Sequence, residues 1–154
     1  MTLTKSNPIP LDASSRLVSR HMRFGWWSLV VFVGLGITLE TLHGFKIVWY
    51  LGVNAETRRL MWTLAHSHGT LLSVLQIVFG LTVPRLSART SSSQVRASMC
   101  LLGAGLLMPL GFFLGGLFCY SGDPGIGILL VPPGGLLMLI GVASAAWCVQ
   151  KDFH

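Results

Sequence analysis

Four long apolar segments, separated by short polar stretches, dominate the hydrophobic pattern of the chain. A transmembrane helix needs about 20 mostly apolar residues. All four segments reach that length, and none contains Lys, Arg or Asp; they cover residues 24–45, 60–83, 97–120 and 125–149. The pattern therefore predicts an all-α protein, built as a four-helix bundle that is integral to a membrane.

These boundaries divide the chain into three parts. We expect a cytoplasmic tail over residues 1–23, a membrane domain over 24–150 and a C-terminal tail over 151–154. Aromatic side chains gather near the ends of the segments, where Trp and Tyr prefer the headgroup level of a bilayer. They are Trp26, Trp27, Trp49, Tyr50, Trp62, Tyr120 and Trp147.

Prolines make the course of the third and fourth helices less regular. Pro109 predicts a kink in the third helix. In the fourth segment Pro132 and Pro133 leave two alternatives: a kinked helix, or a helix that begins near Pro132, where a proline costs no hydrogen bond. The second alternative makes residues 125–131 an irregular segment at membrane depth. Such backbone is tolerated only where protein buries it or where it lines a cavity.

Composition supports a lipid environment and excludes several other classes. The chain of 154 residues is 52% hydrophobic and only 10% charged, whereas a soluble domain is about 25% charged. The net charge of +6 does not indicate nucleic-acid binding, because the basic residues lie between apolar segments and form no patch. The three cysteines all fall inside apolar segments, so we expect no disulfide framework.

The basic residues also predict an orientation. Lys and Arg concentrate on the cytoplasmic side of membrane proteins. Of the eleven in this chain, eight lie in the two tails and the second loop, and the remaining three lie in the first loop. The count places both termini in the cytoplasm and predicts a multi-pass protein of the inner membrane.

Ionisable groups inside the apolar segments are the candidate functional residues. An Asp, Lys or Arg at a helix centre costs about 2.5–3.5 kcal/mol, so intramembrane ionisable groups are functional candidates by default. Glu40 and His43 lie on the first segment, and His66 and His68 lie on the second. The third and fourth segments contain no His, Asp or Glu. Any such chemistry is therefore expected between the first two helices, toward the outer leaflet.

The second segment carries a polar seam. Its members recur at helical spacing and must face protein, because lipid offers them no partner; they are Thr63, His66, Thr70, Ser73 and Gln76. His68 lies about 200° around the helix from His66. We therefore expect His68 to face a different helix or an apolar ligand.

Imidazole and carboxylate groups are good ligands for zinc, copper or iron. The Glu40-x-x-His43 spacing also recurs in carboxylate-bridged metal bundles. The candidate metal ligands are therefore Glu40, His43, His66 and His68. Two alternatives stay open: histidines that only make hydrogen bonds between helices, and a pathway for protons or substrate.

Residues 64–69, with the sequence Leu-Ala-His-Ser-His-Gly, resemble the His-x-His helix of haem-copper oxidase subunit I and of smaller bacterial membrane proteins that share its architecture. In that family the two imidazoles leave opposite faces of one helix, and each meets a haem iron. The resemblance implies haem b as a cofactor, with His43 and either His66 or His68 as the axial pair. Basic residues on the same side would meet the haem propionates: Lys46, Arg58 and Arg59. The chain departs from the family in having fewer spans and no histidine cluster for copper.

Two functions follow as expectations. The first is a membrane protein that binds haem or a transition metal between its first two helices, in a respiratory or redox-related role. The second is a non-enzymatic accessory or assembly subunit whose histidines are structural. Gly111-x-x-x-Gly115 fits the small-residue pattern of helix contacts, and we expect it to dock a larger complex or a second copy.

Overall fold

The computed structural model describes residues 11–52, 55–86, 91–120 and 122–152. Four long helices account for most of them: α1 (Leu11–Gly44), α3 (Glu56–Thr82), α4 (Ser91–Leu117) and α5 (Val131–Asp152). Three short helical turns join them: α2 (Val48–Leu51), η2 (Val83–Arg85) and η4 (Ile126–Leu130). This part of the chain contains no β-strand, only an isolated bridge between Tyr120 and Asp123.

All four long helices are long and apolar enough to cross a membrane. The candidate spans are Ser14–Gly44, Glu56–Arg85, Ser92–Leu117 and Ile126–Lys151. The predicted all-α membrane architecture is therefore confirmed.

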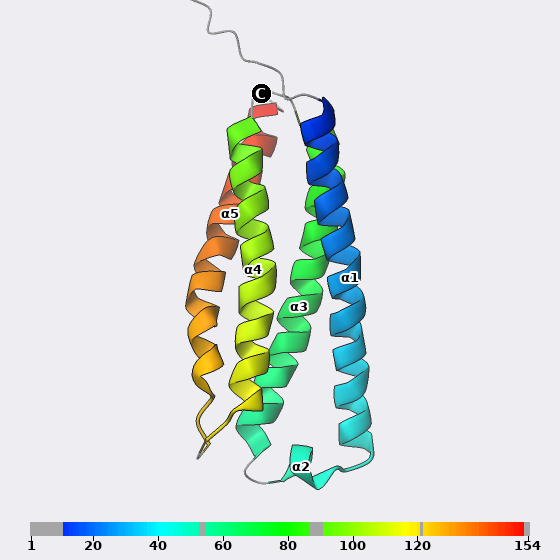
Figure 1. Cartoon of the computed structure of the whole chain (residues 1–154), viewed down its shortest axis with the longest axis vertical. Coiled ribbons are helices and arrows are strands. Elements are labelled where there is room, and N and C mark those ends of the chain that lie inside the picture. Colours follow the sequence, from blue (N-terminus) through cyan, green and yellow to red (C-terminus); the bar gives the residue numbers. More distant parts are fainter. Residues whose placement is uncertain (1–10, 53–54, 87–90, 121, 153–154) are drawn as a thin grey trace, which may run out of the picture.

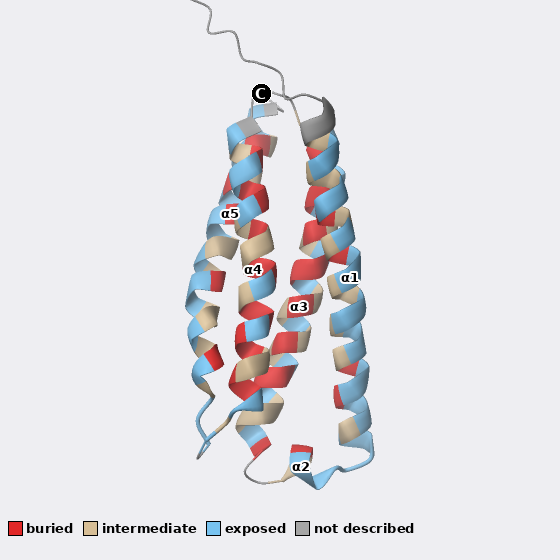
Figure 2. Cartoon of the chain, in the orientation of Figure 1, coloured by how far each residue is buried: buried red, intermediate tan, exposed pale blue. Residues whose placement is uncertain are grey.

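The helices stand side by side in the order α1, α3, α4, α5 (Figure 1). Each long helix packs mainly on its neighbour in this row, so α1 and α5 lie at the two edges. In the most apolar stretch of α1, 11% of the residues are buried, against 50% in that of α4 (Figure 2). The edge helices consequently present most of their surface outward, to lipid.

The largest core lies where α3 meets α4. Met61, Ala65 and Leu72 of α3 pack there against Met108 and Phe112 of α4. Because lipid tails are as apolar as these side chains, close van der Waals packing, rather than removal from water, holds transmembrane helices together.

Three helices begin earlier than the apolar segments predict. α1 is helical from Leu11, so residues 11–23 of the expected tail belong to the helix, while residues 1–10 lie outside the described part. α3 begins at Glu56 and α4 at Ser91. Polar residues continue a helix well, because its backbone hydrogen bonds are internal and long charged side chains reach outward to water. Residues 153–154 of the expected C-terminal tail also lie outside the described residues.

The α-helical part of the fourth span begins at its prolines. α5 starts at Val131, so Pro132 and Pro133 occupy its first turn, where the missing N–H groups cost nothing. The preceding residues form η4 against α4, and the N–H of Gly125 donates to the carbonyl of Gly115 at 2.8 Å. α5 thus starts near Pro132, as the second alternative predicts, but the residues before it are a 3-10 helix and not an irregular segment. α4 itself runs through Pro109 as one helix.

The Gly111–Gly115 face of α4 is used inside the chain. Both glycines are buried. A Cβ at Gly111 would come within 2.9 Å of Val131 Cγ2 and 3.1 Å of the Gly127 carbonyl. The face that we expected to dock a second chain is thus covered by the chain's own η4 and the start of α5.

Candidate functional site

His66 reaches from α3 across to α1. Its Nδ1 lies 2.7 Å from the carbonyl oxygen of Phe32. Because a carbonyl only accepts, Nδ1 donates to it, and in the neutral imidazole the lone pair is then on Nε2. The ring lies directly over Gly36, where any Cβ would collide with its Cε1 atom. The glycine therefore makes room for the imidazole.

A groove of about 380 Å³ opens beside this ring, between α1 and α3. Glu40 and His43 of α1 line it together with His66, as do Thr63 and the buried Tyr50. Three of the four predicted metal ligands thus converge on one groove.

The helix register sets how closely these ligands can approach one another. Glu40 lies four residues after Gly36 and His43 seven, which are rises of about 6 and 10 Å along α1. Glu40 is therefore the nearer ionisable neighbour of His66. His43 lies at the rim, where it also borders a cavity lined by Lys46. Among the described residues, no three His, Cys, Asp or Glu side chains are already gathered closely enough to hold a metal ion.

His68 lies apart from the groove. Its Nδ1 is 2.9 Å from the carbonyl oxygen of Leu64, one turn earlier in the same helix. Its ring packs on Phe112 of α4, with 4.9 Å between the ring centroids. His66 and His68 therefore face α1 and α4 respectively, as their spacing predicts.

Arg58 and Arg59 hold α2 over the end of the bundle. Arg58 donates to the carbonyl oxygens of Trp49 at 3.1 Å and Gly116 at 3.3 Å, and its guanidinium lies 4.4 Å from the centroid of the Trp49 ring. Arg59 donates to the Tyr50 carbonyl oxygen at 3.3 Å and to that of Gly52 at 3.4 Å. Both arginines thus fix the residues around α2, and through Tyr50 one wall of the groove.

A second polar cluster lies toward the opposite end of α1, and sequence reasoning missed its central residue. His21 is completely buried: its Nδ1 lies 2.5 Å from Gln76 Oε1 and its Nε2 lies 2.8 Å from Ser98 Oγ. Gln76 Nε2 donates to the Leu101 carbonyl oxygen at 2.6 Å. With Gln76 so oriented, Nδ1–H of His21 donates to Oε1, and Nε2 accepts from the serine hydroxyl. Arg20 donates to that hydroxyl at 3.2 Å.

The cluster joins α1, α3 and α4 at one level. We placed His21 in the N-terminal tail because the apolar segment begins after it. Two signals could have found it. His21 lies seven residues before Ser28, on the same face of a continued helix, and Gln76 on the predicted seam needed a buried partner.

The polar seam of α3 was expected to face protein, and the structure shows that it faces α1. Between the two histidine levels, Ser73 Oγ lies 2.7 Å from Ser28 Oγ. Thr70 Oγ1 is buried and has no hydrogen-bond partner among the described residues. The seam therefore joins α1 to α3 at three levels: His66 with Phe32, Ser73 with Ser28, and Gln76 with His21.

Comparison of the chain with protein-family models, with curated proteins and with solved structures found no match to any of them.

Proposed function

We propose that this multi-pass membrane protein binds a transition metal ion in the groove between α1 and α3, in a respiratory or redox-related role. The observation that carries the proposal is the His66 ring: Nδ1 is held by the Phe32 carbonyl, and the ring lines the groove. Histidine ligands of metals are characteristically oriented by such a bond from their other nitrogen. The resemblance of residues 64–69 to a haem-binding helix supports the redox role.

Glu40 would supply the second ligand. It is an exposed side chain on the wall of the groove, so it is free to turn toward His66 when an ion enters. One imidazole with one carboxylate suits zinc, copper or iron(II), and His43, further along α1, would lie outside this pair. Water would fill the remaining positions.

The geometry favours a single ion over haem b. Two axial nitrogens lie about 2 Å from a metal, hence about 4 Å from each other. His43 stands about 10 Å of helix rise beyond the position under His66. His68 contacts α4 instead. An ion bound by His66 and Glu40 requires less rearrangement of the helices than either axial pair of haem b. Arg58 and Arg59, the expected partners of the haem propionates, already donate to backbone carbonyls.

We place both termini in the cytoplasm, with the inner membrane as the location. The support is the distribution of charge: the end of the bundle that carries residues 11 and 152 has more basic residues than the α2 end. Among the described residues, the first end carries Arg16, Arg20, Arg23, Arg85, Arg96 and Lys151. The α2 end carries Lys46, Arg58 and Arg59.

A second candidate function is an accessory or assembly subunit with structural histidines. The hydrogen bonds of His68 within its own helix, and of His21 with two neighbouring helices, favour this reading for those two residues. The Gly111–Gly115 face is covered by η4, so a larger complex or a second copy would dock elsewhere, on the edge helices.

Titration with Co²⁺ tests the metal proposal. Purified protein in mild detergent should develop visible d–d absorption that saturates near one equivalent. Glu40→Gln should weaken binding about tenfold or more, by the scale of changes around metal ligands. Thr38→Val, on the same helix but outside the groove, is the matched control and should bind normally. Absence of any spectral change in the unaltered protein would refute the metal site, and a Soret band in the purified protein would assign haem instead.

A further inference from the structure

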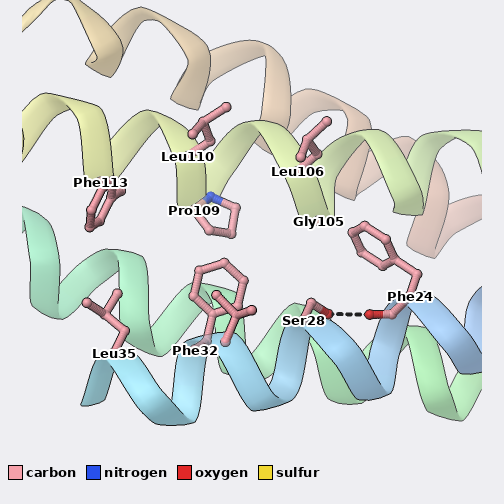
Figure 3. Close-up of a pocket in the computed structure, with 10 residues that line it drawn as sticks. Phe24, Ser28, Phe32, Leu35, Gly105, Leu106, Pro109, Leu110 and Phe113 are labelled. Carbon is pink, nitrogen blue, oxygen red and sulfur yellow. Dashed lines mark hydrogen bonds between the residues drawn. The ribbon is translucent and has the colours of Figure 1, made fainter. Parts of the chain in front are cut away.

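A second cavity, of about 460 Å³, lies between α1 and α4 (Figure 3). Phe24, Val31 and Phe32 line it from α1, and Leu106, Pro109 and Phe113 line it from α4. Its volume falls in the range of about 300–1,000 Å³ that is typical of ligand sites. α3 holds α1 and α4 apart, so the two helices barely pack on each other.

The lining offers almost nothing to a polar ligand. Among the described residues, Ser28 contributes the one polar side chain to it. Its hydroxyl donates to the Phe24 carbonyl oxygen at 2.7 Å and accepts from Ser73 Oγ at 2.7 Å. The described lining includes no charged side chain. A ligand must therefore be held by apolar contact.

The cavity opens sideways at the middle of the membrane spans. Val31 and Leu106 at its edge are 62% and 57% exposed, whereas Pro109 at its floor is buried. Its α1 wall comprises residues 24–35, the centre of the span Ser14–Gly44. The opening consequently faces the hydrocarbon interior of a bilayer, about 15 Å from either headgroup layer.

We propose that this cavity binds one acyl chain of a bilayer phospholipid, which fills the space between α1 and α4 and so holds α1 in place. A hydrocarbon chain matches both the apolar lining and the depth of the opening. The proposal is independent of the metal groove, because the described lining residues of the two sites do not overlap.

Photo-cross-linking tests the proposal. The full chain is reconstituted into phosphatidylcholine vesicles that contain a phosphatidylcholine with a diazirine at the middle of one acyl chain. After illumination, labelled peptides are quantified by mass spectrometry. We expect label to concentrate on the cavity residues of α1 and α4, above its level on the exposed face of α5. Equal labelling of all lipid-facing surfaces would overturn the proposal.

Leu106→Trp places a larger side chain at the cavity edge. The indole occupies space that the acyl chain would need, so cavity labelling should fall about tenfold, which corresponds to about 1.4 kcal/mol in affinity. Leu136→Trp on α5 is the matched control, because Leu136 is 59% exposed and lines no part of the cavity. If Leu106→Trp fails to fold, Val31→Trp fills the cavity from its other wall. Undiminished cavity labelling in a folded variant would overturn the proposal.

Discussion

At the scale of single residues, the close fit of His66 over Gly36 determines where the imidazole ring lies beside the groove. The ring occupies the space that a side chain at position 36 would need, and its Nδ1–H is bound to Phe32. Any enlargement at Gly36 must push the imidazole away from α1. The proposed ligand atom, Nε2, would move with it.

We therefore expect Gly36→Ala to destabilise the protein and to weaken metal binding. Overpacking should lower the free energy of unfolding by about 1–3 kcal/mol. The higher helix propensity of Ala should raise it by only about 0.5–1 kcal/mol. Gly34→Ala is the control, because nothing lies within 4 Å of a Cβ at Gly34. Thermal unfolding in detergent should show a lower midpoint for Gly36→Ala than for Gly34→Ala. Equal midpoints would mean that His66 does not pack on Gly36.

His21 offers a second test at this scale. In His21→Leu, Gln76 Oε1 and Ser98 Oγ lose a buried partner, and an unsatisfied buried group costs about 1–3 kcal/mol. The unfolding midpoint should therefore fall clearly, while His43→Leu at the exposed rim should change it little. Adding Gln76→Leu to His21→Leu should recover part of the loss, because an apolar pair leaves fewer orphaned groups. A purely additive double variant would argue against the bond between the two side chains.

The sequence revealed some of these residues and concealed others. Glu40, His43 and His66 were visible because an ionisable group stands out within an apolar segment, and the register of two antiparallel helices brought them to one groove. His21 was concealed because it lies among arginines, in a stretch that composition assigns to a tail. The hydrogen bonds of the two α3 histidines were not predictable, because they depend on side-chain rotamers. The spacing of residues along a helix does not determine whether His66 bonds to a carbonyl of α1 or His68 to one of its own helix.

At the scale of elements, η4 is the segment whose structure depends most on small residues. Gly127 is buried against α4, and a Cβ there would collide with Leu114 and lie 2.8 Å from the backbone nitrogen of Gly115. The short helix can lie at membrane depth because α4 covers it on one side. The prolines then allow α5 to begin without losing hydrogen bonds.

Gly127→Ala should separate η4 from α4. The expected cost is about 1–3 kcal/mol, because backbone atoms form the opposing surface and cannot turn aside. Gly135→Ala, in the first turns of α5, is the control, since nothing lies within 4 Å of its Cβ. Hydrogen exchange of the η4 amides should become faster in Gly127→Ala and stay unchanged in Gly135→Ala. Equal exchange in both would show that η4 does not depend on this contact.

The number of helices was predictable, whereas their ends were not. Apolar runs of sufficient length specify spans, but a helix such as α1 continues into Arg16 and Arg20 because its backbone bonds do not depend on hydropathy. For the fourth span, the sequence alone could not choose between a kinked helix and a start at Pro132. The choice depended on whether α4 offered small residues on which η4 could pack.

At the scale of the whole molecule, the row of helices leaves two edges that lipid must cover. The sequence specifies four spans but not their order in space, because that order depends on which faces fit together. The polar seam indicated only that this face of α3 meets protein, and the structure shows that its partner is α1. The exposed α1 and α5 faces then follow from their places at the edges of the row (Figure 1). The lateral opening of the α1–α4 cavity follows from the same arrangement.

The charge asymmetry between the ends of the row predicts the topology. We expect Lys151→Cys to react with a membrane-impermeant maleimide only after cells are opened, and Glu56→Cys to react in intact cells. Both residues are exposed in the structure. The reverse pattern of labelling would place the termini outside. It would also contradict the positive-inside argument for this chain.

Metal analysis of protein purified from membranes in mild detergent tests the central claim most directly. The unaltered chain should contain about one transition metal ion, and His66→Ala should lose it, because the ligand atom is gone. His68→Ala should retain the ion, since His68 contacts α4 away from the groove. Equal metal content in the two variants, or none in the unaltered protein after incubation with zinc, copper or iron, would contradict the account.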